Sequence, residues 1–382
     1  MKLFFSTSFF FLFLFPVIGQ VDGSRGTTEM KNKGGNSTEQ EILIKKNQLA
    51  TPVKNQQQTG TCWAFSTASL LESQALRSNK LLDLSEMYVV RNIYIEKAKN
   101  YILRQGKTQF SEGGLGHDLI RAVALYGAVP ENVYNGLTEG NTEYNHSAMV
   151  ADLKSYLDTL LAKPPVASGW LNGYIKLLNK TMGIPASSFS YNNQTYTPQT
   201  FAKEALRFNA NDYVNITSFL HHPFYQSFIL EVPDNFSNGS YYNLPLNEML
   251  DVIKSALNNG YTIMWDADVS NSGFQPKNGF ALYQGKKPFG DSSTKMMNEM
   301  EWSDTARQRM FEELTTQDDH LMHIVSMENK DGKTFFNVKN SWGEHGPFKG
   351  YIKASEAYIA MNTISIVIPK AALPKTLLDK LK

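Results

Sequence analysis

The stretch Pro52–Phe65, PVKNQQQTGTCWAF, contains Cys62, the single cysteine of the 382-residue chain. Gly and Thr residues lead up to this cysteine, and apolar residues then recur at helical spacing, at Ala64, Ala68, Leu71 and Ala75. The pattern predicts a helix from Cys62 to about Ser78, with the thiol at its first position. Unpaired N–H groups and the positive end of the helix dipole favour an anion there, so we expect the pKa of the thiol to fall. A thiolate is the nucleophile that acyl transfer requires.

Three consecutive glutamines precede the cysteine, at Gln56, Gln57 and Gln58. Gln56, six residues before Cys62, can point its amide at the reacting group and stabilise a developing oxyanion. The residues alone do not distinguish it from its two neighbours, because each of the three can equally be a surface side chain.

A histidine and an asparagine are predicted to face each other across a hairpin. His323 begins one predicted strand, Asn340 ends the next, and Asp331-Gly332 between them is a favoured two-residue turn. Both residues lie eight positions from this turn, so the expected register sets them directly opposite on one face of the sheet. The amide then holds one ring nitrogen and leaves the other for the thiol. His320 is the rival base, but it precedes the predicted strand and has no such partner.

Two stretches carry a resemblance to a known family. Gln56–Phe65 resembles the papain family signature around its nucleophile, and Lys339–Gly343, KNSWG, resembles that family's asparagine motif. The resemblance implies a cysteine peptidase that hydrolyses peptide bonds through a thioester acyl-enzyme.

The resemblance also implies roles for individual residues. The catalytic set that it implies is Cys62 as nucleophile, His323 as general base, Asn340 as orienting partner of the histidine and Gln56 as oxyanion donor. Trp342 is expected to shield the hydrogen bond between the asparagine and the histidine. Gly113 and Gly114, which are expected to bind the substrate backbone, and Trp342 form the substrate-binding set that the resemblance implies.

Within that family the chain is most similar to the bleomycin hydrolase and aminopeptidase C group. Thr59 stands where the family's disulfide cysteine would precede the nucleophile, and Asp319–His323 and Asn340–Glu344 resemble stretches of the group. Between Cys62 and His323 lie 261 positions, against about 130–150 in the papain pattern, which indicates an insertion. The group implies an aminopeptidase. The end of the chain does not align with the C-terminal arm of that group, so the choice between aminopeptidase and endopeptidase, the hexameric ring and the oligomeric state stay open.

Helical patterns dominate the first half of the chain and strand patterns the second, which indicates an α+β fold. The resemblance specifies a papain-like two-lobe fold, with a helical lobe, an antiparallel β-barrel-like lobe and a helical insertion. Helices are expected at 62–78, 85–103, 118–126 and 247–257, and strands at 228–232, 262–265, 323–328, 335–339 and 364–369. The predicted segments are a signal peptide (1–19), a flexible leader (20–45), a helical lobe with the nucleophile (46–140), a helical insertion (141–210) and a β-rich lobe with the histidine and asparagine (211–382).

The first residues are typical of a secretory signal. Lys2 provides a positive start, Leu3–Phe15 is mostly Phe and Leu, and Pro16–Gly19 provides a cleavage region. The apolar run is shorter than the roughly 20 residues that span a bilayer. We therefore expect a secreted protein, or one in the periplasm or at the cell surface, with no membrane span.

Charge and histidine content restrict the partners and cofactors. The 37 basic and 36 acidic residues nearly cancel, so a nucleic-acid partner is not expected, and peptides or proteins are the expected substrates. The adjacent histidines His221 and His222 would point to opposite faces of a strand, and no Cys or His follows at ligand spacing. No metal and no cofactor are therefore expected.

Two other functions remain as alternatives. A papain fold can serve as an inactive binding module, although such modules usually lose the nucleophile or the base. Another thiol acyl-transfer enzyme, such as a transglutaminase-like protein, would normally have Asp where Asn340 stands. Labelling of Cys62 by an epoxide inhibitor of papain-type enzymes would separate a peptidase from an inactive module.

Overall fold

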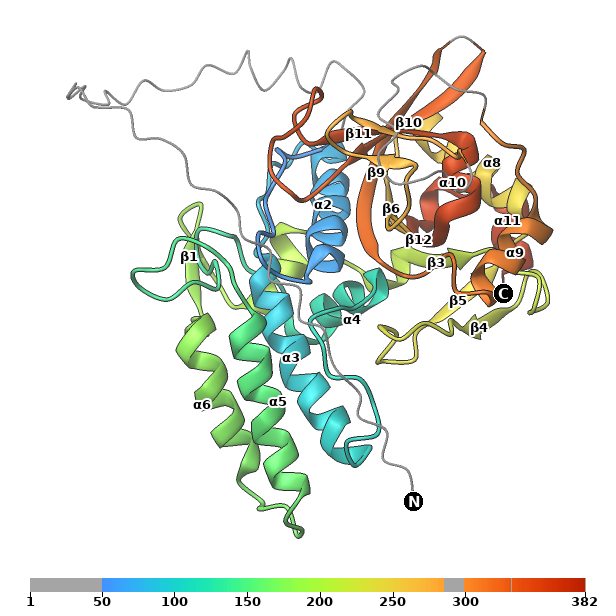
Figure 1. Ribbon diagram of the computed structural model, residues 1–382. Coiled ribbons are helices and arrows are strands. Elements are labelled where there is room, and N and C mark those ends of the chain that lie inside the picture. Colours follow the sequence, from blue (N-terminus) through green and yellow to red (C-terminus); the bar gives the residue numbers. More distant parts are fainter. Residues whose placement is uncertain (1–49, 285–298, 331, 382) are drawn as a thin grey trace, which may run out of the picture. The chain divides into compact units, whose positions relative to one another are not determined.

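Helix α2 (Cys62–Arg77) is the element against which both halves of the chain pack. Thirteen of its 16 residues are buried, and small residues such as Ala64 and Ala68 allow close approach on several sides. It contacts α3 and α4 on one side and strands β9 and β6 on the other (Figure 1). The computed structural model describes residues 50–284, 299–330 and 332–381, so the predicted signal peptide and the first part of the chain lie outside the described residues.

The helical side is built around α3 (Glu86–Leu103) and α4 (Gly116–Tyr126). Ser85 caps α3 by accepting a hydrogen bond from the backbone N–H of Tyr88, which confirms the predicted start of this helix. Helix α4 ends at Gly127, whose φ of 80° is one that glycine adopts readily.

Residues 141–210 contribute further helices to this side. Helices α5 (Ser147–Leu161) and α6 (Trp170–Met182) pack against each other and against α3, and Figure 1 shows the three side by side. Their contact faces are fully buried at Leu153, Leu157, Tyr174 and Leu178. A short hairpin of β1 (Phe189–Tyr191) and β2 (Gln194–Tyr196), one turn of α7 (Pro198–Thr200), a π-helical turn (Phe201–Ala205) and a 3-10 turn (Ala210–Asp212) follow.

The second half of the chain forms a ten-stranded mixed sheet in the order β4-β5-β3-β12-β6-β9-β10-β11-β8-β7. Neighbouring strands are antiparallel except for the parallel pairs β3/β5 and β11/β8. The strands are β3 (Tyr213–Thr217), β4 (Ser227–Ile229), β5 (Ser240–Asn243), β6 (Ile263–Ala267), β7 (Phe274–Gln275), β8 (Phe280–Ala281), β9 (His320–Lys330), β10 (Lys333–Lys339), β11 (Tyr351–Ser355) and β12 (Thr363–Pro369).

Four helices and one turn accompany the sheet: α8 (Leu246–Asn258), α9 (Asp304–Glu312), α10 (Glu356–Asn362), the 3-10 turn Lys370–Ala372 and α11 (Lys375–Lys380). A second apolar core lies here, and Leu377 and Leu381 at the end of the described chain are buried in it.

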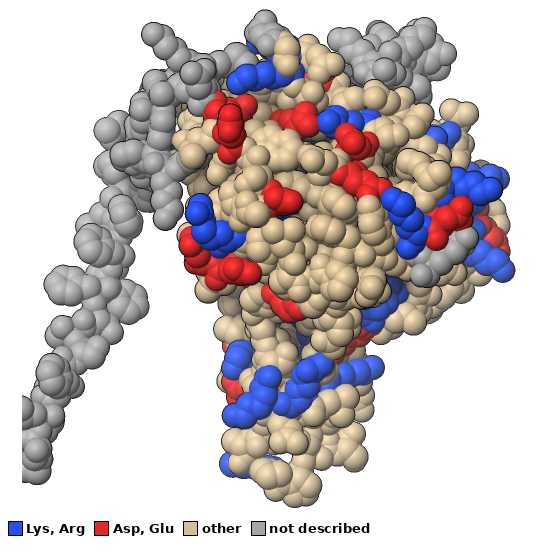
Figure 2. All heavy atoms as spheres, turned by 90° about the vertical axis from the view of Figure 1, so that its right-hand side faces the viewer, with Lys and Arg blue, Asp and Glu red and all other residues tan. Residues whose placement is uncertain are grey.

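On the face in Figure 2, acidic and basic side chains are interspersed. Within the part of the chain that the structure describes, no helix has both the length and the apolar character required to cross a bilayer.

The predicted hairpin is present, but its register changes partway along. Lys330 pairs with Lys333 across the turn, Gly332 has a φ of 76°, and the expected pairing continues to Ser326 and Asn337. Asp331 itself lies outside the described residues. A β-bulge then leaves Val325 without an opposite residue, and the next pair is Ile324 with Val338. His323 is therefore opposite Lys339, not Asn340.

Candidate active site

Cys62 lies at the first residue of α2, as predicted, in the wall of a cavity of about 380 Å³. It is 7% exposed, and the backbone of Leu321 in β9 acts to lower the pKa of its thiol. The cavity is lined by Gln56, Gly60, Cys62, Gln109, Ser111, Gly113, Gly114, Asp234, Val269, Ser270, Asp318, Asp319, His320, Leu321 and Trp342. The cavity thus lies between the loop that precedes Cys62, the start of β9, the segment before α4 and the segment after β10.

The histidine in this cavity is His320. Strand β9 begins at this residue, three positions earlier than predicted, and its Nε2 lies 2.7 Å from Oδ1 of Asn340. The asparagine oxygen can only accept, so Nε2 donates and the other ring nitrogen, Nδ1, is left as a base. The ring of Trp342 stacks on the imidazole at a centroid distance of 4.5 Å and an interplanar angle of 29°.

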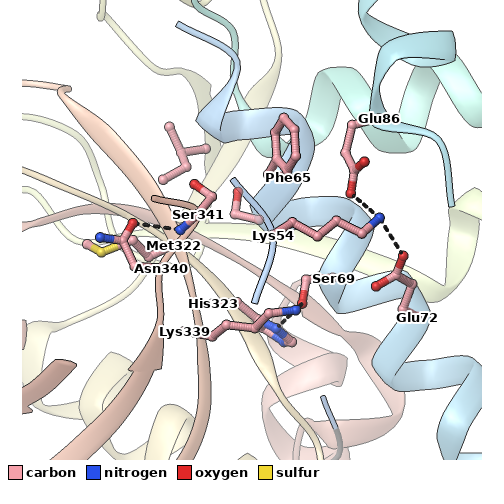
Figure 3. A pocket seen from close by; sticks show the side chains of 12 residues that line it. Lys54, Phe65, Ser69, Glu72, Glu86, Met322, His323, Lys339, Asn340 and Ser341 are labelled. Carbon is pink, nitrogen blue, oxygen red and sulfur yellow. Dashed lines mark hydrogen bonds and ion pairs between the residues drawn. The ribbon is translucent and has the colours of Figure 1, made fainter. Parts of the chain in front are cut away.

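The prediction that His323 is partnered by Asn340 is wrong. His323 is 1% exposed, and its Nδ1 is 2.9 Å from Oγ of Ser69 in the middle of α2. Lys339 donates to the same Oγ at 2.8 Å. Figure 3 shows His323 together with Ser69 and Lys339, with Asn340 apart from them. His323 does not line the Cys62 cavity.

The β-bulge at Val325 explains this error. Side chains alternate between the two faces of a strand. A shift of the register by one residue therefore places two residues that were expected to be opposite each other on different faces of the sheet. Met322 and Val338 belong to the core of the sheet side, whereas Leu321 belongs to the core around α2. His323 shares the α2 face with Leu321. Asn340 lies on the opposite face of the sheet, and His320 is its diagonal neighbour on that face.

Burial shifts the pKa values of the cysteine and the histidine in opposite directions. Burial, together with the negative charges of Asp318, Asp266 and Asp234, raises the pKa of the Cys62 thiol to about 12. It lowers the pKa of His320 to about 4, although the hydrogen bond to Asn340 acts the other way. The expectation of a lowered thiol pKa at the helix N-terminus is therefore wrong, because desolvation outweighs the helix end.

Among the three consecutive glutamines, Gln56 lines the cavity and the other two do not. Its backbone N–H donates to the carbonyl of Ser341 at 2.8 Å, and its side-chain oxygen accepts from Ser341 Oγ at 2.6 Å. One amide hydrogen is used by the carbonyl of Thr59, at 2.7 Å. Gln58 instead bonds Asn145, at 2.9 Å. The structure thus singles out Gln56, which the residues alone could not.

Gly113 and Gly114 form another part of the cavity wall. A Cβ atom on Gly114 would lie 3.1 Å from the ring of Trp63, and one on Gly113 would lie 1.8 Å from Oδ2 of Asp234. A side chain at either position would therefore crowd its neighbour, Trp63 at Gly114 or Asp234 at Gly113. Their predicted contact with the substrate backbone stays a prediction, and so does the shielding role of Trp342, which is 37% exposed above His320.

Carboxylates in and behind the cavity wall were missed by the sequence analysis. Asp234, Asp318 and Asp319 line the cavity, and Asp319 accepts from the backbone N–H of Ser270 at 2.9 Å. Behind them Asp266 is fully buried, and burial raises the pKa of its carboxyl to about 7. The adjacent Asp318-Asp319 pair directly before His320 was a visible signal for part of this group.

Comparison with known proteins gives the following matches. The sequence model of the Peptidase C1-like family matches residues 16–382. The chain is 24% identical over 374 residues to aminopeptidase C of Lactobacillus delbrueckii subsp. lactis, covering 85% of this chain and 80% of that protein. It is 22% identical over 390 residues to bleomycin hydrolase of Mus musculus, covering 88% and 84%. The crystal structure of PepW from Lactobacillus rhamnosis aligns with a TM-score of 0.68 at 21% identity, covering 90% of this chain and 86% of that chain, so the two share a fold.

The lowered pKa of His320 predicts how stability depends on pH when the thiol is removed. In the Cys62→Ser variant, the unfolded chain binds a proton at this histidine below about pH 6.5, whereas the folded chain does so only near pH 4. The contribution of His320 to the free energy of unfolding should therefore decrease as the pH falls from about 6.5 towards 4, because the unfolded state binds more protons at this ring. Urea unfolding at several pH values measures this slope.

The matched control is the double variant Cys62→Ser/His320→Gln, which lacks the titrating ring. Its free energy of unfolding should decrease less steeply over the same interval. Equal slopes in the two proteins would show that His320 is not held neutral by burial.

Proposed function

Because the chain belongs to the Peptidase C1-like family, we propose that this papain-like cysteine peptidase uses Cys62 as nucleophile, His320 as general base and Asn340 as the residue that orients the base. The observation that carries this proposal is the hydrogen bond of 2.7 Å from His320 to Asn340 at the wall of the cavity that also contains the thiol. The papain-like α+β fold agrees with the prediction from the sequence.

The proposed first step is attack of the Cys62 sulfur on the carbonyl carbon of the substrate. The thiol proton moves to Nδ1 of His320 as the C–S bond forms, and the carbonyl oxygen becomes an oxyanion. The backbone N–H of Cys62, in the first turn of α2, and the second amide hydrogen of Gln56 are donors for that oxyanion. The imidazolium then protonates the leaving amine, which departs and leaves a thioester on Cys62.

The second step releases the acyl group. Water attacks the thioester carbonyl while Nδ1 of His320 accepts its proton, and that proton returns to the sulfur as the acid product leaves. Burial disfavours a thiolate and an imidazolium when each forms alone. Transfer of one proton from Cys62 to His320 creates both charges together, and their attraction in a cavity of low dielectric offsets much of that cost.

We further propose that cleavage occurs at the amino terminus of the substrate. Relatives of this chain are named aminopeptidase C, and the carboxylates of Asp234, Asp318 and Asp319 line the cavity, where they suit a substrate ammonium group.

Export is a separate proposal, supported by the sequence of residues 1–19. Expression of the full chain in a secreting host, followed by sequencing of the mature amino terminus, tests it. Cleavage near Gly19 is expected, and an uncleaved protein retained in the cytoplasm would contradict it.

The two histidines of the HLMH stretch provide a matched test of the general base. His320→Gln should lower kcat/KM by at least about 100-fold, because general base catalysis typically contributes 10²–10⁴-fold. His323→Gln should change kcat/KM of the folded protein only slightly, since this ring contacts Ser69 and lies outside the cavity. Kinetics with a fluorogenic peptide, normalised to circular dichroism of the folded protein, measure both. The reverse pattern would return the role of base to His323.

The oxyanion donor is tested by the neighbouring glutamines. Gln56→Ala should lower kcat by about 10²–10³-fold, the usual cost of losing one such donor. Gln58→Ala is the control, because that side chain bonds Asn145 and does not line the cavity. Similar losses in the two variants would mean that Gln56 acts only through the shape of the loop.

Specificity for the amino terminus is tested with pairs of substrates that differ only in acetylation. A peptide with a free amino terminus should be cleaved with a kcat/KM at least about tenfold above its acetylated partner, since one charge-assisted hydrogen bond contributes roughly 1.5–3 kcal/mol. Equal rates, or internal cleavage of longer acetylated peptides, would identify an endopeptidase. Either result leaves the assignment of Cys62, His320 and Asn340 intact.

A further inference from the structure

A cluster of three metal-ligating side chains lies outside the residues that line the catalytic cavity. His221 and His222 are in the segment between β3 and β4, and Glu231 follows β4. One ligand atom from each lies within 4.8 Å of the other two. The sequence analysis set the two histidines on a strand, facing opposite ways and without a third ligand. That interpretation is wrong, because both rings turn towards the carboxylate of Glu231.

We propose that His221, His222 and Glu231 bind a zinc ion. Nε2 of His222 is 2.7 Å from Oε1 of Glu231, and Nε2 of His221 is 3.4 Å from Oε2. Zinc bonds of about 2.0–2.2 Å place tetrahedral ligand atoms roughly 3.3 Å apart, so only small adjustments are required. The three side chains are 28%, 30% and 53% exposed, which leaves a path for the ion and a fourth position for water.

Gln308 of α9 holds the ring of His221 in a ligating orientation. Its Nε2 lies 2.9 Å and its Oε1 3.3 Å from Nδ1 of His221, so the amide can donate to this nitrogen or accept from it. The same Oε1 accepts from the backbone N–H of Leu220 at 2.6 Å, which fixes the amide. When Nε2 binds zinc, the proton is on Nδ1 and Gln308 Oε1 accepts it. A partner for the second ring nitrogen is typical of histidine ligands in metal sites.

The backbone that carries the two histidines is held by a buried side chain. Asn243, at the end of β5, is fully buried and donates to the carbonyls of Phe219 and His222, both at 2.8 Å. It also accepts from the N–H of Phe219 at 2.8 Å. Phe228 stacks on the ring of His222 at a centroid distance of 3.9 Å. The ligands are thus largely ordered before the ion arrives, which favours binding.

Zinc at this position would connect segments that are far apart in the sequence. It would join the segment after β3 to the end of β4 and, through Gln308, to α9. Glu231 is three residues before Asp234, which lines the catalytic cavity against Gly113. The ion would therefore restrain a segment that leads directly to the cavity wall.

Zinc binding to the full chain in the Cys62→Ser background tests the proposal, because this background removes the catalytic thiol as a competing ligand. Titration calorimetry with Zn²⁺ should give one ion per chain, and Co²⁺ should give the absorption of a tetrahedral complex. His222→Gln and Glu231→Gln should each weaken Zn²⁺ binding at least tenfold. Gln308→Ala should weaken it about 10–100-fold, the usual effect of losing a partner of a ligand.

His345→Gln in the same background is the control, because this histidine bonds the carbonyl of Gly343 and is not part of the cluster. It should leave Zn²⁺ affinity unchanged. Circular dichroism of each variant without metal verifies the fold, and Zn²⁺ should raise the melting temperature of the control but not of His222→Gln. Absence of Zn²⁺ binding in the Cys62→Ser background, or binding unaffected by His222→Gln and Glu231→Gln, would overturn the proposal.

Discussion

The packing of α2 along β9 is the constraint that sets the positions of His320 and His323. The helix begins at Cys62 beside the start of the strand, and seven residues later Ser69 contacts His323. Seven helical residues extend about 10.5 Å, and the three strand residues from His320 to His323 extend about 10 Å. The two elements therefore advance together, and the thiol reaches the beginning of β9 while the middle of the helix covers His323. Helix α2 thus places Cys62 beside the start of β9 and covers the buried part of that strand.

An ionic network, buried at Glu72 and Glu86 and exposed at Asp83, fixes the loop that carries Gln56 against this helix. Lys54 contacts the carboxylates of Asp83 at 2.6 Å, Glu86 at 2.8 Å and Glu72 at 3.4 Å. Glu72 belongs to α2 and Glu86 to α3, so one ammonium group holds the loop to both helices. Removing such a cation would leave buried carboxylates without compensation, which is a large penalty. The position of the proposed oxyanion donor therefore depends on charges that never meet the substrate.

Local sequence patterns predicted much of this site, and the wrong choice of His323 as the base came from one bulged residue, Val325. The thiol at a helix N-terminus, the two-residue turn and the first half of the hairpin register could all be read from the chain, because each depends on neighbours in sequence. The bulge at Val325 could not, since it depends on how β9 fits between β6 and β10 while Leu321 and Met322 fill different cores. The residues alone could not separate Gln56 from Gln57 and Gln58. The resemblance chose Gln56, and its contact with Ser341, which is distant in sequence, accounts for its place at the cavity wall. The third partner of His221 and His222 was missed because a carboxylate was not considered as a ligand.

The stacking of Trp342 on His320 places a fluorescent side chain in contact with the proposed base. An indole face attracts a cationic ring more strongly than a neutral one, so the contact at 4.5 Å changes character when the imidazole gains a proton. Because Trp342 is 37% exposed, its emission also responds to anything that covers the cavity mouth. Its emission is therefore expected to respond to the charge of the proposed base, over a background from the other four tryptophans of the chain.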